Sequence, residues 1–267
     1  MTSQNIQVAS YENKQYIWKQ SAHALFNCMK ELQYLKLALT NMGIAPRYYP
    51  EYVDYLKINN LNKIIFPMTC FCDIPLSKLN YHIDNYGSYA IGLDKANWGI
   101  SNGLQPIKYV NPQSQLSKDY VSSFNIASNI NLSEKDSVLK DYILSDLLFT
   151  KPLIGKMDKK DNVLFQDECE WRYVPPLSDK INIPLVLSQN QTQILNYNLE
   201  LYNRVILEHP ELWLRFTIED IRYLIVPNES DSKLLLEFIF TQLDLCNSDK
   251  YVLATKIIQM DNLREDI

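Results

Sequence analysis

The sequence predicts an α+β fold: a single domain with a mixed or split β core flanked by helices. Two observations lead to this fold class. Strand-like and helix-like segments are interspersed without the regular strand–helix alternation of a doubly wound sheet. A length of 267 residues with 46% hydrophobic residues suits one compact domain with a substantial core. No repeat, heptad pattern or long linker divides the chain, so we expect one domain over residues 1–267.

Local patterns predict the elements of the first half of the chain. Residues 1–15 are polar and are expected to be frayed. Leucines at helical spacing indicate a helix that Gly43 stops, and the two prolines of PRYYP indicate a loop. The predicted order is a segment at 22–29 that fits either a strand or a helix start, a helix at 31–41, a loop at 46–50, a strand at 64–73, a helix at 76–86, and strands at 89–93 and 105–110.

The second half continues with both kinds of element. Ser133 and Asp136 have the spacing of a capping box before a helix that runs through Phe149. The KMDKKDN charge run after Pro152 and Gly155 indicates a loop or hairpin arm. The predicted order is that helix, a loop or hairpin arm at 151–165, a strand at 168–174, a helix at 191–208, a strand at 221–226, an amphipathic helix at 230–245, and a segment at 250–260 that ends in a strand.

Composition and charge exclude several classes of protein. A net charge of −5 argues against a general binder of nucleic acid or anionic membranes, because phosphate attraction needs clustered Lys and Arg. No apolar run approaches the roughly 20 residues that span a bilayer, and the N-terminus lacks a signal-peptide pattern. Five cysteines without framework spacing fit a reducing compartment. We therefore expect a cytoplasmic location.

The segment FQDECEWRYVPP (165–176) carries an alternating charged row. Glu168, Glu170 and Arg172 would share one face of a strand, because side chains alternate across a sheet. Two acids beside an arginine can form a general base with a cation that orients it. They can equally be a solvent-facing row whose charges pair with one another. Spacing alone favours the solvent-facing row.

A second dense segment, at 66–93, combines Cys70, Cys72, Asp73, His82 and Tyr86. Cys-x-Cys is not the Cys-x₂₋₄-Cys spacing usual in structural zinc sites, so no metal is expected and the thiols are interpreted as core packing. Two of the residues, His82 and Tyr86, lie four apart on one helical face and could either contact a ligand or fill a crevice. The carboxylate of Asp73 could cap a helix or serve as a site acid, and the cap is favoured.

The loop predicted at PRYYPE offers one more candidate. Arg47 and Glu51 flank a tyrosine pair, and a loop arginine can bind phosphate while an aromatic ring stacks on a base or nicotinamide. A plain surface loop is the favoured alternative.

Several strings together resemble the AbiGi family of abortive phage-infection proteins. They are LALTNMGIAPRYYPE (37–51), PMTCFCDIPLS (67–77), HIDNYGSYAIGLDK (82–95), LQPIKYV (104–110), FQDECEWRYVP (165–175) and IRYLIVP (221–227). Cys169 departs from that pattern, where a more polar residue is usual. The resemblance implies an anti-phage role in a toxin–antitoxin-like pair, with a protein partner from the same defence module that looks like a nucleotidyltransferase.

A weaker likeness extends to DUF2971-type proteins and, through them, to the ADP-ribosyltransferase plan. That likeness implies NAD as cofactor and phage or host macromolecules as targets. It implies Glu170 as the catalytic carboxylate, with Glu168 behind it. The remaining implied NAD-pocket residues are Arg47, His82, Tyr86 and Arg172.

Three functional hypotheses therefore remain open. The leading one is an abortive-infection effector that transfers ADP-ribose from NAD. The second is a non-catalytic antitoxin or phage sensor that binds a partner toxin. The third is a nuclease-like or nucleotide-processing enzyme in which Asp73, Glu168 and Glu170 hold Mg²⁺.

Overall fold

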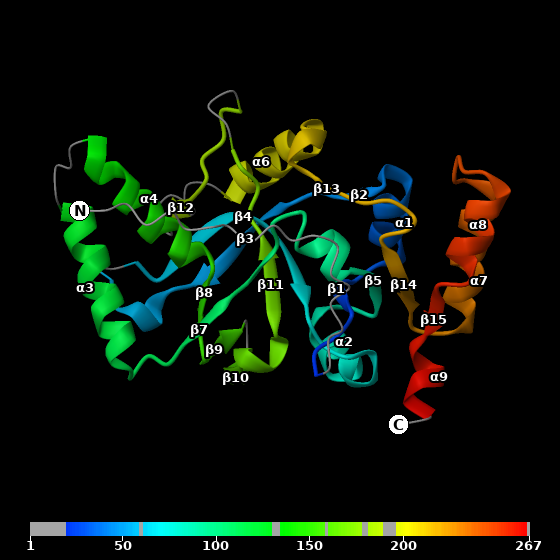
Figure 1. The fold of residues 1–267 in the computed structure, drawn as a ribbon, viewed down its shortest axis with the longest axis horizontal. Coiled ribbons are helices and arrows are strands. Elements are labelled where there is room, and N and C mark those ends of the chain that lie inside the picture. Colours follow the sequence, from blue (N-terminus) through cyan, green and yellow to red (C-terminus); the bar gives the residue numbers. More distant parts are fainter. Residues whose placement is uncertain are drawn as a thin grey trace, which may run out of the picture.

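A central mixed β-sheet organises the molecule, which confirms the α+β class (Figure 1). The computed structural model describes residues 20–58, 61–129, 134–157, 160–177, 181–188 and 196–265. Within these ranges nine strands belong to the sheet, and only the pairing of β14 with β15 is parallel. The main path runs in the order β15 (Ile257–Gln259), β14 (Ile221–Val226), β5 (Tyr89–Asp94), β1 (Ala24–Met29), β4 (Lys63–Cys72), β11 (Glu170–Tyr173) and β6 (Gln105–Pro106).

The long strand β4 is shared by two halves of this sheet. Its last residues, Thr69 to Cys72, pair with β11, and Cys72 also pairs with Phe26 of β1. Its first part pairs instead with β3 (Arg47–Tyr52) and with β12 (Leu187–Ser188). The sheet is therefore split along β4, as the predicted split core required.

In the part of the chain that the structure describes, three small two-stranded sheets surround the central one. Antiparallel pairs join β13 (Leu214–Arg215) to β2 (Gly43–Ile44), and β10 (Lys160–Leu164) to β9 (Ile154–Met157). A parallel pair joins β7 (Lys108–Val110) to β8 (Thr150–Pro152). The β9–β10 hairpin occupies the segment for which the charge run predicted a loop or hairpin arm.

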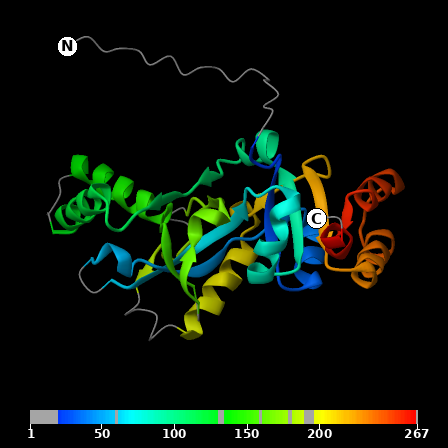
Figure 2. The same cartoon turned by 90° about the horizontal axis from the view of Figure 1, so that it is seen from below.

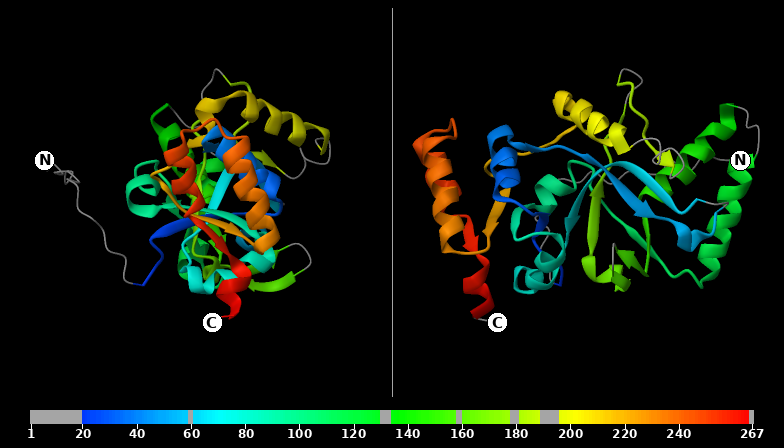
Figure 3. Two further views of the ribbon diagram at one scale, coloured as in Figure 1. Left: turned by 90° about the vertical axis from the view of Figure 1, so that its right-hand side faces the viewer. Right: turned by 180° about the vertical axis from the view of Figure 1, so that it is seen from behind.

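Helices cover both faces of the main sheet (Figures 1 and 3). On one face, α1 (Leu32–Asn41) and α7 (Glu229–Thr241) pack on alternate strand residues such as Leu25, Phe71 and Ile91. On the other face, α2 (Leu79–Tyr86) packs on the intervening residues, among them Phe26 and Cys72. The two apolar faces of the strands explain why the buried strand sequences read as nearly continuous hydrophobic runs.

The β3–β4–β12 half has its own covering helices. α6 (Asn196–Glu208) lies over one face, where Tyr48 and Ile65 pack with Ile206. On the other face, Phe66 and Met68 pack with Leu147 at the end of α4 (Glu134–Leu148). The helices α3 (Gln115–Asn129) and α4 project from this end of the molecule (Figure 2). At the other end of the described chain, α8 (Asn247–Ala254) and α9 (Met260–Glu265) flank β15.

Some local predictions were wrong for identifiable reasons. The segment PRYYP is largely strand β3, because an edge strand tolerates a proline such as Pro50. α1 ends at Asn41 as predicted, but the left-handed residue that caps it is Met42, and Gly43 begins β2. Residues 105–110 form two short strands, and the polar helix α3 was not predicted. Residues 1–15, Ser133 and residues 191–195 lie outside the described residues.

Gly87 closes α2 against β1 in a way that only glycine allows. Its φ of +129° lies in the region that other residues rarely adopt. A Cβ at this position would lie 2.1 Å from the carbonyl oxygen of Met29. α2 is therefore anchored directly on strand β1.

Among the described residues, no helix has the length and apolar character that a bilayer crossing requires.

Candidate functional site

The charged residues predicted on the late strand lie in the interior. Arg172 is fully buried and Glu170 is 5% exposed, so the predicted solvent-facing row was wrong. The strand is shorter than predicted, because residues 165–168 form a turn of 3₁₀ helix and Cys169 adopts a left-handed conformation. Glu168 therefore lies on this turn and not on the strand that carries Glu170 and Arg172.

Arg172 makes contacts with nearly every element around it. Its Nε donates to Glu170 Oε1 at 2.8 Å, and its Nη2 donates to Glu51 Oε1 at 3.2 Å. Its Nη1 donates to the carbonyl oxygen of Leu148, at the end of α4. The guanidinium also lies over the ring of Phe66, 5.4 Å from its centroid. The side chain thus joins β11, β3, β4 and α4.

Lys151 of β8 is the second buried cation of the cluster. Its Nζ donates to Glu168 Oε2 at 3.0 Å. It lies 2.8 Å from Glu170 Oε2, which is an ion-pair distance but not an aligned hydrogen bond, and 4.0 Å from Glu51 Oε1. Three carboxylates therefore share two cations. Glu51, Glu168, Glu170, Lys151 and Arg172 are called the buried ion cluster below.

Two aromatic residues of α2 border the buried ion cluster. The hydroxyl of Tyr86 donates to Glu168 Oε1, and it lies 3.2 Å from Met157 Sδ. The ring of His82 stacks on that of Tyr86 with centroids 4.4 Å apart. From another side, the backbone N–H of Glu170 donates to the hydroxyl of Tyr109 at 2.8 Å. The predicted His82–Tyr86 pair is thus brought to the predicted acids.

Burial and charge act on the pKa values of these groups in opposite directions. Burial raises the pKa of Glu170, but the charges of Arg172 and Lys151 outweigh it and lower that pKa well below its usual range. Burial also raises the pKa of Glu168, and there Lys151 and Tyr86 offset only part of the effect. The pKa of Lys151 is raised, because the three carboxylates outweigh its burial. Glu170 and Lys151 are consequently held in their charged forms.

This geometry suits a structural role better than a chemical one. A general base needs a carboxylate that can reach a substrate proton. Both oxygens of Glu170 are instead occupied by cations of the same chain. Removing one partner of such a buried network costs about 3–5 kcal/mol, because the remaining charge is left unpaired. The roles assigned to Glu170 and Glu168 in catalysis stay predictions.

The other predicted site residues lie apart from the buried ion cluster. Arg47 is exposed on β3, four residues before Glu51. The carboxylate of Asp73 bonds to Lys95 Nζ at 2.8 Å and accepts from the backbone N–H of Ala22 at 2.9 Å. Because Lys95 is fully buried, Asp73 forms a separate internal ion pair. It does not share a Mg²⁺-like arrangement with the acids at 168 and 170.

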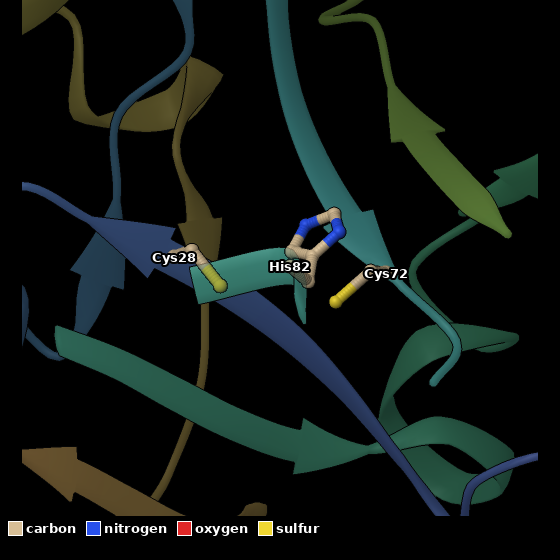
Figure 4. A group of neighbouring side chains, drawn as sticks. All are labelled: Cys28, Cys72 and His82. Atoms are coloured by element: carbon tan, nitrogen blue, oxygen red, sulfur yellow. The ribbon is translucent and has the colours of Figure 1, made fainter. Parts of the chain in front are cut away.

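The cysteines of the CFC string have different surroundings. Cys70 packs beside Glu170 and Arg172, and burial raises the pKa of its thiol well above the usual value. Cys72 lies instead near Cys28 of β1 and His82 of α2 (Figure 4). Among the described residues these three offer possible metal-ligand atoms within 4.8 Å of one another.

Sequence reasoning missed Lys151, Tyr109 and Cys28 as members of these groups. Lys151 stands in a charge-rich segment that reads as a loop, and its partners come from three other elements. A lysine directly before Pro152, between an apolar helix end and a hairpin, was the only local signal. Glu51 was noted only as a neighbour of Arg47, not as a partner of Arg172.

Comparison with known proteins assigns the family. Residues 42–227 match a family model described as "Putative abortive phage resistance protein AbiGi, antitoxin". The chain is 33% identical over 254 residues to "Abortive phage resistance protein AbiGi" of Lactococcus lactis subsp. cremoris, covering 84% of this chain and 100% of that protein. No solved structure matches the chain. The chain therefore belongs to the AbiGi family of abortive phage resistance proteins.

Proposed function

We propose that this chain is the antitoxin of an abortive-infection module and that it neutralises a partner toxin by binding it as a folded protein. The observation that carries the proposal is the match to an antitoxin family over residues 42–227. That range contains the whole buried ion cluster and most of the split sheet. An antitoxin of this kind acts in the cytoplasm, where it meets a toxin made from the same module.

The state of the buried ion cluster supports binding over catalysis. Glu170 would be the catalytic carboxylate in the ADP-ribosyl transfer hypothesis, yet it is 5% exposed and paired with two cations. A carboxylate that stabilises a ribosyl cation must face the substrate. The cluster is better suited to hold β3, β8, β11 and α4 together as a rigid scaffold for a partner.

The surface of α4 offers a place for such a partner. Val138, Leu139 and Tyr142 are 68%, 51% and 66% exposed and are neighbours on the helix, at positions i, i+1 and i+4. Elsewhere on α4, Ile143, Leu147 and Leu148 are buried and pack the helix against the body. Helical spacing groups Leu139, Tyr142, Ile143 and Leu147 as one apolar face, but only Ile143 and Leu147 of that set are buried. We call Val138, Leu139 and Tyr142 the α4 patch and propose that the partner toxin covers it.

The test is a pull-down with the product of the neighbouring toxin gene. We expect the two proteins to copurify and the chain to restore the growth of cells that express the toxin. Replacing all three α4-patch residues by Ser should weaken binding at least 10-fold, because exposed anchors of this kind contribute about 2 kcal/mol or more at the centre of an interface. Binding is measured by calorimetry or surface plasmon resonance.

A matched control distinguishes the loss of the α4 patch from a general loss of exposed apolar side chains. Leu201→Ser with Leu207→Ser removes exposed apolar side chains from α6, which are 51% and 48% exposed, and should leave binding unchanged. If the α4 variant binds as tightly as the wild type, the α4 patch is not the interface but the antitoxin role stands. If no complex forms and growth is not restored, the antitoxin proposal is wrong.

A further inference from the structure

Three metal-ligating side chains converge beneath α2. The Sγ atoms of Cys28 and Cys72 and a ring nitrogen of His82 all lie within 4.8 Å of one another (Figure 4). They come from β1, β4 and α2, so residues far apart in the sequence meet at one point. Cys72 is buried, whereas Cys28 and His82 are half-buried.

The fold itself brings these three side chains together. Phe26 of β1 pairs with Cys72 of β4, and side chains two residues apart on a strand share a face, so Cys28 and Cys72 point to the same side of the sheet. α2 packs on that side through Leu79 and Ile83. The close contact of Gly87 with β1 then sets the height of the helix above the strands. One helical turn earlier, His82 faces the two thiols.

We propose that Cys28, Cys72 and His82 bind one Zn²⁺ ion through two sulfurs and one imidazole nitrogen, with water as the fourth ligand. Thiolate and imidazole are the ligands that Zn²⁺ prefers, at about 2.3 Å and about 2.0–2.1 Å. Ligand atoms on one tetrahedral ion lie roughly 3.5–4 Å apart by these lengths. The three atoms need only a small inward movement to reach that spacing. Water can enter because Cys28 and His82 are partly exposed.

A disulfide between the two thiols fits the strand register less well. Cys28 is the diagonal neighbour of Cys72, offset by two residues from the direct partner Phe26. Diagonal Cα atoms lie about 7–8 Å apart, beyond the roughly 4.4–6.8 Å that a disulfide spans. A metal ion bridges the longer separation without moving the backbone. The register therefore favours shared metal ligation over oxidation.

Zinc at this point would fasten α2 to the centre of the sheet. His82 stacks on Tyr86, and Tyr86 bonds to Glu168, so the ion would also fix one border of the buried ion cluster. We assign the ion a structural role, because its ligands would tie α2 to strands β1 and β4. The inference is independent of the antitoxin proposal.

The first test measures bound metal in the full chain. Purified without chelator, or desalted after incubation with one equivalent of Zn²⁺, the wild type should contain about one zinc per chain by mass spectrometry. Cys28→Ser and His82→Gln should each lower the zinc content at least fivefold. Cys246→Ser is the matched control, because that exposed cysteine precedes α8, and it should retain full zinc.

Cobalt substitution tests the ligand set without any variant that could unfold. The Co²⁺ form should show sulfur-to-metal charge transfer of the strength expected for two thiolates and the d–d bands of a tetrahedral site. A wild type that holds no zinc, a spectrum without thiolate bands, or a Cys28→Ser variant that keeps one zinc would overturn the proposal. So would a Cys28–Cys72 disulfide found by alkylation and peptide mass mapping under native conditions.

Discussion

Replacing Arg172 by Met is the sharpest test of the structural role of the buried ion cluster. The methionine keeps much of the volume but removes the guanidinium that bonds to Glu170, Glu51 and the carbonyl oxygen of Leu148. Three acceptors then lose a donor in a largely buried site. Breaking a buried charge network in this way costs about 3–5 kcal/mol. For a chain of this size that corresponds to a fall in Tm of about 6–20 °C.

The assay is urea unfolding followed by the fluorescence of the four tryptophans. Lys233→Met is the matched control, because Lys233 is 72% exposed and pairs with Glu229 on the helix surface. It should change the free energy of unfolding by less than about 0.5 kcal/mol. The double variant Arg172→Met with Glu170→Gln should cost at least about 1 kcal/mol less than the sum of the single variants, because it also removes the stranded carboxylate.

Two results would refute this reasoning. A free energy of unfolding for Arg172→Met within 1 kcal/mol of the wild type would mean that the contacts contribute little. Strict additivity in the double variant would mean that Arg172 and Glu170 do not stabilise each other. In either case the structural role of the buried ion cluster would be refuted, and a catalytic role for its carboxylates would again have to be considered.

Three further predictions use other parts of the chain. Gly87→Ala should lower the free energy of unfolding in urea by about 3 kcal/mol or more, because its Cβ would meet the backbone of β1. Gly103 has a φ of +70° but no atom within 4 Å of the position that a Cβ would take, so Gly103→Ala should lower the free energy of unfolding by only about 1 kcal/mol. Equal effects of the two variants would contradict the close contact with β1. Burial raises the pKa of Asp94, but bonds from Asn97 and Arg222 outweigh it and lower that pKa. The ionised Asp94 therefore stabilises the fold fully above the unfolded pKa of about 3.9, and this effect is lost as the pH falls through the folded pKa. The difference in free energy of unfolding between wild type and Asp94→Asn should narrow below about pH 4. A difference that stays constant down to about pH 2 would contradict the prediction. Saturating NAD should leave Tm unchanged. The ADP-ribosyltransferase hypothesis instead requires the free energy of unfolding to rise by about 2.7 kcal/mol when the NAD concentration is 100 times Kd.

Local patterns were sufficient for the elements that carry their own signals. β4, β5 and β14 read as strands because nearly every residue is apolar, and α7 reads as a helix because Leu235, Phe238 and Ile239 recur at helical spacing. β3 was misread as a loop because proline is a turn signal that an edge strand can override. α3 was missed although Tyr120, Phe124 and Ala127 recur at helical spacing, because the polar residues around them are typical of a loop. In the structure the Tyr120 hydroxyl donates to the Ile143 carbonyl.

The candidate site could be predicted only in part, because its burial depends on contacts between segments far apart in the sequence. Alternation correctly put Glu170 and Arg172 on one face, but it carries no information about what covers that face. Burial was decided by Lys151, from a segment that resembles a loop, and by Glu51, from a strand misread as a loop. The Cys28–Cys72–His82 group was hidden because Cys72 meets a cysteine from another strand instead of its sequence neighbour Cys70.

The sharing of β4 by two half-sheets has a consequence for how the protein is made. β1 and β3 precede β4 in the chain, but β11 and β12 are synthesised far later. Until the ribosome has released residues up to 188, one edge of β4 has no partner, and an open edge invites pairing with other chains. Arg172 also arrives in this late part, so the acid Glu51 has no guanidinium partner before then. The split sheet therefore cannot be completed until residue 188 has been made, and chains truncated before β12 are expected to aggregate.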